Sequence, residues 1–94
     1  MHTFEWNEIK NKINKLKHKV DFVEAQNAFL DKNKIYARDT SHSKSEERYF
    51  VFAKIKRGII TVRFTYRAGT IRIFGAGFWR KGKKEYEKQN NIHR

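Results

Sequence analysis

The chain has 94 residues and a formal net charge of +12, with 22 lysines and arginines against 10 aspartates and glutamates. This length leaves no room for a second hydrophobic core, the absence of cysteine excludes disulfides and thiolate metal sites, and no apolar run reaches membrane-spanning length. We therefore predict a single domain over residues 1–94 that binds a polyanion and, because the N-terminus lacks a signal-peptide pattern, lies in the cytoplasm.

The first predicted elements are a short strand and a helix. Residues 4–6 predict an edge strand or a strap over the core. Asn7 suits the N-cap of a helix over residues 8–17, because its side chain can accept a hydrogen bond from the first turn. Lysines occupy the other faces of this helix, and His18 falls near its end. Its apolar stripe, at the spacing of an amphipathic surface helix, is Ile9, Ile13 and Leu16.

A second helix is predicted to begin after Asp21. Glu24 stands three residues later, which is the spacing of a capping box. Residues 31–34 are polar and end this helix, and residues 35–39 predict a strand at one edge of the sheet. The expected buried stripe of the second helix is Phe22, Val23, Ala25, Ala28, Phe29 and Leu30.

Residues 48–77 alternate with period two and contain two glycine corners, Arg57-Gly58 and Ala68-Gly69. This pattern predicts three antiparallel strands joined by two-residue loops. The resulting register pairs Lys56 with Ile59, Phe52 with Arg63, Arg48 with Arg67, Thr65 with Arg72 and Arg63 with Phe74.

The same alternation sorts the side chains of these strands onto two faces. One face carries no charge and is expected to form the core: Tyr49, Val51, Ala53, Ile55, Ile60, Val62, Phe64, Tyr66, Ile71 and Ile73. The other face gathers four arginines with no acidic neighbour on that face: Arg48, Arg63, Arg67 and Arg72. Like charges that face one another destabilise strand pairing, so this pattern favours an anion-binding surface over a merely solvated one.

The C-terminal segment returns to the body of the domain. Phe78 and Trp79 are expected to seal the core, with base stacking on an exposed Trp79 as the alternative. Residues 80–90 predict a strongly basic helix, although Gly82 weakens its first turn.

Several motifs, taken together and in order, resemble the BrnT family of toxins. They are FEWN at residues 4–7, KH at 17–18, FVEAQNAF at 22–29, HS at 42–43, EERY at 46–49, TVRFTYR at 61–67, IRI at 71–73 and GAGFWRK at 75–81. Each motif alone is weak, but their order and spacing over residues 4–87 are specific.

The resemblance implies an α+β fold similar to that of the RelE ribonucleases, with two N-terminal helices packed on a small antiparallel sheet and a C-terminal helix. It also implies a ribonuclease toxin that arrests translation and is neutralised by a BrnA-like antitoxin, through which alone the chain would reach DNA. Many members of the family read Ser-Ala-Arg where this chain has Gly75-Ala76-Gly77. Arg80 or Lys81 is therefore expected to replace the missing arginine.

RNA cleavage without a metal needs a base for the 2′-hydroxyl, cations for the charge on the phosphorane, and an acid for the leaving 5′-oxygen. We expect Arg63 and Arg72 to stabilise that charge. His18 is the best acid or base, although the helix dipole would account equally well for a histidine at a helix end. Glu46 is either a base or the ion-pair partner of Arg48. The expected catalytic residues are His18, Glu46, Arg48, Arg63, Arg72 and Arg80, and the expected RNA-binding residues are Lys17, Lys54, Arg67, Trp79 and Lys81.

No metal and no cofactor are expected, because the four histidines lie apart and no phosphate-binding glycine loop occurs. Two alternatives to a ribonuclease stay open. One is a non-catalytic RNA-binding module of the same fold. The other is a protein whose basic surface docks an acidic partner, since phenylalanines among arginines suit a protein interface as well as an RNA one: Phe50, Phe52 and Phe74.

Overall fold

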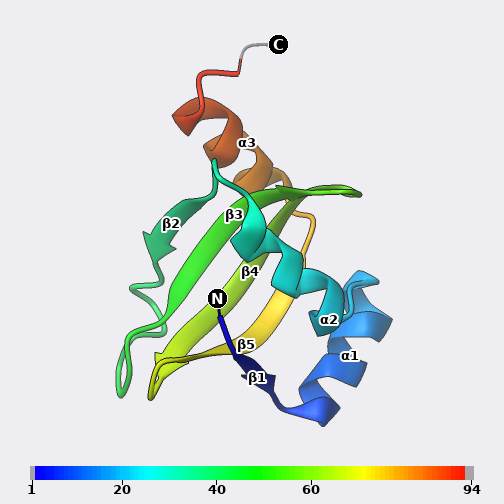
Figure 1. The fold of residues 1–94 in the computed structure, drawn as a ribbon, viewed down its shortest axis with the longest axis vertical. Helices are drawn as coiled ribbons and strands as arrows, with labels where there is room; N and C mark the ends of the chain where they lie inside the picture. Colours follow the sequence, from blue (N-terminus) through cyan, green and yellow to red (C-terminus); the bar gives the residue numbers. More distant parts are fainter. Residues whose placement is uncertain (1, 93–94) are drawn as a thin grey trace.

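The computed structural model describes residues 2–92, which form a five-stranded sheet with helices packed around it (Figure 1). The strands are β1 (Phe4–Trp6), β2 (Ile35–Arg38), β3 (Tyr49–Ile55), β4 (Gly58–Arg67) and β5 (Thr70–Gly77). The helical elements are α1 (Glu8–His18), α2 (Phe22–Ala25), the 3₁₀-helix η1 (Gln26–Leu30) and α3 (Arg80–Gln89). The predicted α+β class is therefore confirmed. Over the described residues, no helix is both long enough and apolar enough to span a membrane.

The sheet has the strand order β1-β5-β4-β3-β2 and is mixed rather than wholly antiparallel. β2 pairs antiparallel with β3 at one edge, as predicted. At the other edge β1 pairs parallel with β5, with Glu5 opposite Arg72. The N-terminal segment is thus an edge strand, and it brings an acidic side chain beside the arginine face.

The core lies between the sheet and the α2–η1 segment, which crosses one face of β3 and β4 in Figure 1. The uncharged face predicted for β3, β4 and β5 lies there; Tyr49 is half-buried, and all its other members except Tyr66 are buried. Tyr66 was predicted to be a core residue, but it is 49% exposed because it lies near the end of β4, beyond the cover of the helices. In the α2–η1 segment Val23 and Leu30 also face solvent, contrary to prediction, while four residues of the stripe are buried: Phe22, Ala25, Ala28 and Phe29.

Helix α1 packs on the sheet with its polar side. Its buried residues are Asn11 and Asn14. The Asn14 side-chain amide donates to the carbonyl of Ala76 at 2.9 Å and accepts from the amide of the same residue at 3.1 Å. Asn11 accepts from the backbone amide of Phe22 at 2.8 Å. These bonds occupy backbone groups at the edge of β5 and at the start of α2, so the apolar stripe of α1 points away from the core.

Two caps predicted from the sequence are present. The side chain of Asn7 accepts from the amide of Lys10 at the start of α1, and that of Asp21 accepts from the amide of Val23 at the start of α2. The hydrogen bond from Val23, which outweighs partial burial, lowers the pKa of Asp21. Glu24 does not complete a capping box, because its carboxylate is held by Arg57.

The β3–β4 register differs from the prediction by two residues. Ile55 pairs with Gly58, so the loop is Lys56-Arg57 rather than Arg57-Gly58. Arg57 is fixed in the loop by the carboxylate of Glu24 and the carbonyl of Lys19. Gly58 takes a φ of 143° as the first paired residue of β4, a conformation that suits glycine. A shift of two residues leaves every side chain on its predicted face.

The β4–β5 hairpin has the predicted corner, with positive φ at both Ala68 and Gly69. Thr65 pairs with Arg72 as predicted. Further along, a β-bulge between Arg63 and Phe64 shifts the ladder, so that Arg63 pairs with Gly75 instead of Phe74. The predicted pairing of Arg63 with Phe74 is therefore wrong.

Helix α3 covers the part of the opposite face formed by Phe52 and Thr61. Gly82 lies directly against these two side chains, and both are buried beneath it. Asp31 fastens the helix, since its carboxylate accepts from the Tyr86 hydroxyl at 2.7 Å and from the Lys54 amide at 2.7 Å. Burial and the contact with Asp31 raise the pKa of Tyr86 to about 12. The rest of this face, where the arginines lie, is not covered by α3.

Candidate active site

A cavity of about 190 Å³ opens between α1 and the uncovered part of the arginine face. We call it the α1–β4 cavity. It is lined by Lys10, Ile13, Asn14, Lys17 and His18 of α1, by Arg63 of β4, by Phe74 and Gly75 of β5, and by Trp79. It therefore brings together four of the residues selected from the sequence: Lys17, His18, Arg63 and Trp79.

Arg63 differs from the other three arginines of that face because its guanidinium is not paired with a carboxylate of the described residues. It is half-buried, and in the described part of the chain it forms no ion pair. Its guanidinium lies beside Gly75, where a side chain would reach within 3.9 Å of it. No acidic residue among residues 2–92 lines the cavity, and Lys10 and Lys17 add positive charge. A partly enclosed guanidinium with lysines around it is suited to a phosphate group.

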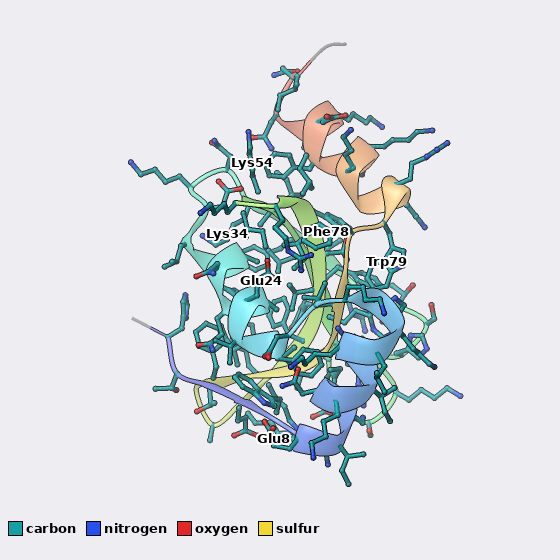
Figure 2. The ribbon with its side chains drawn as sticks, turned by 90° about the vertical axis from the view of Figure 1, so that its right-hand side faces the viewer. Glu8, Glu24, Lys34, Lys54, Phe78 and Trp79 are labelled. Atoms are coloured by element: carbon teal, nitrogen blue, oxygen red, sulfur yellow. The ribbon has the colours of Figure 1, made fainter. Side chains whose placement is uncertain are left out.

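His18 and Trp79 form the other side of the α1–β4 cavity. Their rings meet edge to face, with centroids 5.0 Å apart. In Figure 2, Trp79 lies between the end of α1 and the start of α3. The indole lies over Gly77, so close that a Cβ at that position would come within 2.7 Å of it. Trp79 remains 38% exposed, so it does not seal the core as predicted but presents part of its ring to solvent.

Phe74 connects this cavity to the remaining arginines. The Arg48 guanidinium lies 4.1 Å from the centre of the Phe74 ring, and the Lys10 ammonium lies 5.4 Å from it. Such contacts between cations and an aromatic ring stabilise both positive charges beside one another. Phe74 occupies this place because of the bulge in β5, which frees it from pairing with Arg63.

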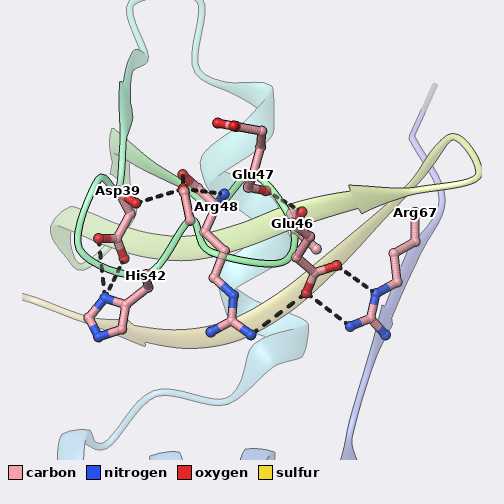
Figure 3. A network of polar contacts seen from close by, with 8 residues as sticks. Asp39, His42, Glu46, Glu47, Arg48 and Arg67 are labelled. Carbon is pink, nitrogen blue, oxygen red and sulfur yellow. Dashed lines mark hydrogen bonds and ion pairs between the residues drawn. The ribbon is translucent and has the colours of Figure 1, made fainter.

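Two of the predicted arginines are paired with Glu46 (Figure 3). The nearest oxygen of Glu46 lies 3.1 Å from Arg67 and 3.6 Å from Arg48. The hydrogen bond from Arg67, which outweighs burial, lowers the pKa of Glu46 below its ordinary value of 4.5. The prediction that these arginines have no acidic neighbour is wrong, because the loop before β3 places Glu46 over them.

That loop is held by a second set of contacts in Figure 3. The buried carboxylate of Asp39 contacts the ring of His42 at 3.0 Å. Ser43 donates to the carbonyl of Asp39 and accepts from the amide of Arg48. The loop is thereby closed onto the start of β3, and Glu46 is kept in place above the arginines.

Arg72 is also paired, since it donates to Glu5 of the neighbouring strand β1 at 2.7 Å. The expected convergence of four free arginines is therefore not formed. Three of them are engaged by carboxylates from a loop and from an edge strand, which the alternation within residues 48–77 did not include. Arg63 alone of the four lines the α1–β4 cavity.

The other predicted residues lie around Trp79 or away from it. Arg80 lines a larger groove of about 700 Å³ with Arg57, Lys83 and Lys84, and Trp79 borders this groove too. Lys81 lines a third depression of about 320 Å³ that also ends at Trp79. Lys54 lies on β3 near Asp31 and lines none of these three depressions. Neither Arg80 nor Lys81 lines the α1–β4 cavity, and Gly77, the position expected to carry the missing arginine, meets the cavity only through Trp79, which lies over it.

Sequence reasoning missed Lys10, Asn14 and Phe74. The first two share a helical face with Lys17, at positions i, i+4 and i+7, and this spacing could have identified them. Nothing in the sequence indicates the bulge that places Phe74. Within residues 2–92, no group of three or more histidine, aspartate or glutamate side chains is arranged to hold a metal ion.

The family model described as the ribonuclease toxin, BrnT, of type II toxin-antitoxin systems matches residues 6–83, which include every residue that lines the α1–β4 cavity. No curated protein matches the chain.

Proposed function

Because the chain belongs to the BrnT family of ribonuclease toxins, and is thus an endoribonuclease, we propose that it cleaves single-stranded RNA in the α1–β4 cavity. The observation that carries this proposal is the meeting of Arg63, His18 and Trp79 around one basic cavity. These groups can stabilise charge on a phosphate and transfer a proton, which RNA cleavage requires, and can stack on a base, which helps to bind the substrate.

The proposed reaction is attack of a ribose 2′-oxygen on the adjacent phosphorus. The bond from phosphorus to the 5′-oxygen of the next nucleotide breaks, and the products end in a 2′,3′-cyclic phosphate and a 5′-hydroxyl. Arg63 stabilises the negative charge that develops on the non-bridging oxygens. His18 transfers one proton, either from the 2′-hydroxyl or to the leaving 5′-oxygen, and solvent water accepts or supplies the other. Lys10 and Lys17 supply further positive charge, so the mechanism requires no metal ion.

Binding of the substrate is assigned to Trp79 and the basic side chains around it. The exposed part of the indole offers a surface on which a base can stack. Trp79 borders both the α1–β4 cavity and the groove that contains Arg80 and Lys83, so a strand of RNA can cross it with phosphates on either side. Glu46, Arg48, Arg67 and Arg72 then support the site rather than contact the scissile phosphate, because they are paired with one another or with Glu5.

As a type II toxin, the chain has a cognate antitoxin as its partner. We propose that cleavage of mRNA arrests translation, that the antitoxin is BrnA-like, and that the chain reaches DNA only through it. A cytoplasmic location follows from this role. The two non-catalytic alternatives are disfavoured by the family match.

The test is cleavage of a labelled single-stranded RNA by antitoxin-free protein in EDTA. His18→Ala and Arg63→Ala should each lower the single-turnover rate about 100-fold or more, because each removes a group that acts on the reacting atoms. The matched control is Arg38→Ala on β2, whose arginine is paired with Glu47 away from the cavity, and its rate should change by no more than about twofold.

Circular dichroism would confirm that the variants fold. Full activity in both folded cavity variants would place the chemistry elsewhere. Absence of cleavage by the folded wild type in EDTA, with recovery on adding a divalent cation, would overturn the metal-independent mechanism.

A further inference from the structure

The outward side of α1 carries an apolar stripe that no other described residue of the chain buries. Ile9 is 70% exposed, Ile13 is 47% exposed and Leu16 is 75% exposed. We call these three residues the α1 outer stripe. Most surface helices turn such a stripe toward the core. Here the opposite side, with Asn11 and Asn14, is buried, so the stripe is free to serve an interface.

Lysines border the α1 outer stripe on both sides. At 100° per residue, Lys12 lies next to Leu16 on one side, and Lys17 and Lys10 lie next to Ile13 on the other. An apolar stripe between two rows of cations is complementary to a helix with an apolar stripe between two rows of carboxylates. The charge of the whole chain favours the same kind of partner, since it stands at +12.

We propose that the α1 outer stripe is the docking site for an acidic amphipathic helix of the cognate antitoxin. The stripe supplies the apolar contact, and Lys12 and Lys17 fix the orientation of the bound helix through its acidic rows. A second copy of this chain is a poor occupant, because it would bring lysines against lysines.

This docking would also control the site. Ile13 of the stripe, and Lys10 and Lys17 at its margin, also line the α1–β4 cavity. A helix laid along α1 therefore borders the mouth of that cavity and draws its lysines away from RNA. This regulatory consequence rests on the proposed function, whereas the docking itself does not.

Cysteine labelling can test the docking directly, because the chain contains no cysteine. Leu16→Cys and Leu30→Cys each introduce one thiol at a leucine of nearly equal exposure, 75% and 78%. Saturation with the cognate antitoxin should slow maleimide labelling of Leu16→Cys by about tenfold or more and that of Leu30→Cys by no more than about twofold. Unchanged labelling of Leu16→Cys in a complex that elutes intact from a sizing column would overturn the proposal.

A second arm tests the charges by measuring the affinity for the antitoxin at about 0.15 M salt. Lys12→Glu and Lys32→Glu change the net charge equally, but only the first lies beside the stripe. Lys12→Glu should raise the dissociation constant about tenfold or more and Lys32→Glu by no more than about threefold. Equal effects of the two substitutions would show that only net charge matters and would overturn the proposed orientation.

Two further measurements on Leu16→Cys examine the other possible occupants. Protection in antitoxin-free protein that grows with protein concentration would assign the stripe to self-association, and protection by anionic phosphatidylglycerol vesicles but not by antitoxin would assign it to a membrane. Either result would overturn the proposal. Because every readout is binding, these results stand apart from the RNA cleavage assay: a chain that fails to cleave RNA can still dock the antitoxin, and the reverse also holds.

Discussion

At the scale of single residues, the position of Trp79 in the candidate site depends on the absence of a side chain at Gly77. Gly77 stands where many relatives are expected to carry arginine, and the Trp79 indole lies over it. An arginine at this position would need the space that the indole fills. The chain has thus exchanged a possible cation for an aromatic surface, and the proposed phosphate binding would rest on Arg63.

Gly77→Ala should therefore displace Trp79, because the new Cβ would lie 2.7 Å from the ring. In a Trp6→Phe background, where Trp79 is the only tryptophan, we expect red-shifted emission and stronger quenching by acrylamide. RNA cleavage should fall about tenfold or more, since the indole is the surface on which we propose that the substrate stacks.

Gly75→Ala is the matched control for the emission measurement. Its Cβ would meet only ordinary contacts, at 3.7 Å from Asn14 and 3.9 Å from Arg63. Identical emission from Gly77→Ala and the parent protein would show that the indole does not depend on a bare backbone at this position.

At the scale of elements, the sequence predicted which residues share one face of a strand or helix, but it did not predict which faces pack against one another. The faces of β3, β4 and β5 could be predicted because alternation is a local property of a strand. The β4–β5 register next to its corner could be predicted as well. The β3–β4 register could not, because a shift of two residues preserves both faces, and the observed register is accompanied by the contacts of Arg57 with Glu24 and Lys19. These partners lie more than 30 residues away along the chain.

The orientation of α1 was hidden for a similar reason. An amphipathic pattern shows that Ile9, Ile13 and Leu16 lie together, but it does not show that a core lies beneath them. The asparagines on the other side of α1 form hydrogen bonds with backbone groups, and no local sequence pattern reveals these bonds.

For the candidate site, the cations could be predicted from composition and alternation. The pairing of Glu46 with Arg48 was one of the two predicted roles of Glu46, but its pairing with Arg67 and that of Glu5 with Arg72 were not predicted, since these carboxylates come from the loop before β3 and from β1.

The contact of α3 with the sheet depends on Gly82. In an exposed helix, replacing glycine by alanine stabilises by about 1 kcal/mol. Here the new Cβ would lie 2.0 Å from the Thr61 hydroxyl oxygen and 3.0 Å from the Phe52 ring. Gly82→Ala should therefore destabilise the protein by about 1–3 kcal/mol, as overpacking does, in urea unfolding followed by circular dichroism.

Thr61→Ala provides the rescue for this experiment. It removes the clashing hydroxyl, which is itself buried without a hydrogen-bond partner. In the Thr61→Ala background, Gly82→Ala should cost less than in the wild type or become stabilising. An equal cost in both backgrounds would contradict the packing derived for this contact.

At the scale of the whole molecule, an excess of 12 positive charges must be held together in a chain of 94 residues. Carboxylates act as local counterions, and three of them have a lowered pKa in the fold: Asp21, Asp31 and Glu46. A carboxyl group with a lowered pKa stabilises the fold above its ordinary pKa, and this contribution is lost as the pH falls through its pKa in the folded state. The same protonation increases the net positive charge, which adds repulsion.

Stability should therefore fall steeply below about pH 4, and Asp31 should account for part of the slope. Burial raises the pKa of Asp31, but its hydrogen bonds, led by that from Lys54, outweigh this and hold the pKa below 3.8. Asp31→Asn should cost about 1–3 kcal/mol at pH 7, as expected for hydrogen bonds to a charged group. The difference from wild type in urea unfolding should shrink as the pH is lowered from 4 toward about 2, because the wild-type carboxylate is then neutral as well. If the difference in unfolding free energy stayed constant across this range, the charge of Asp31 would contribute nothing to stability. Added salt should restore stability equally in both proteins, since it screens the repulsion that they share.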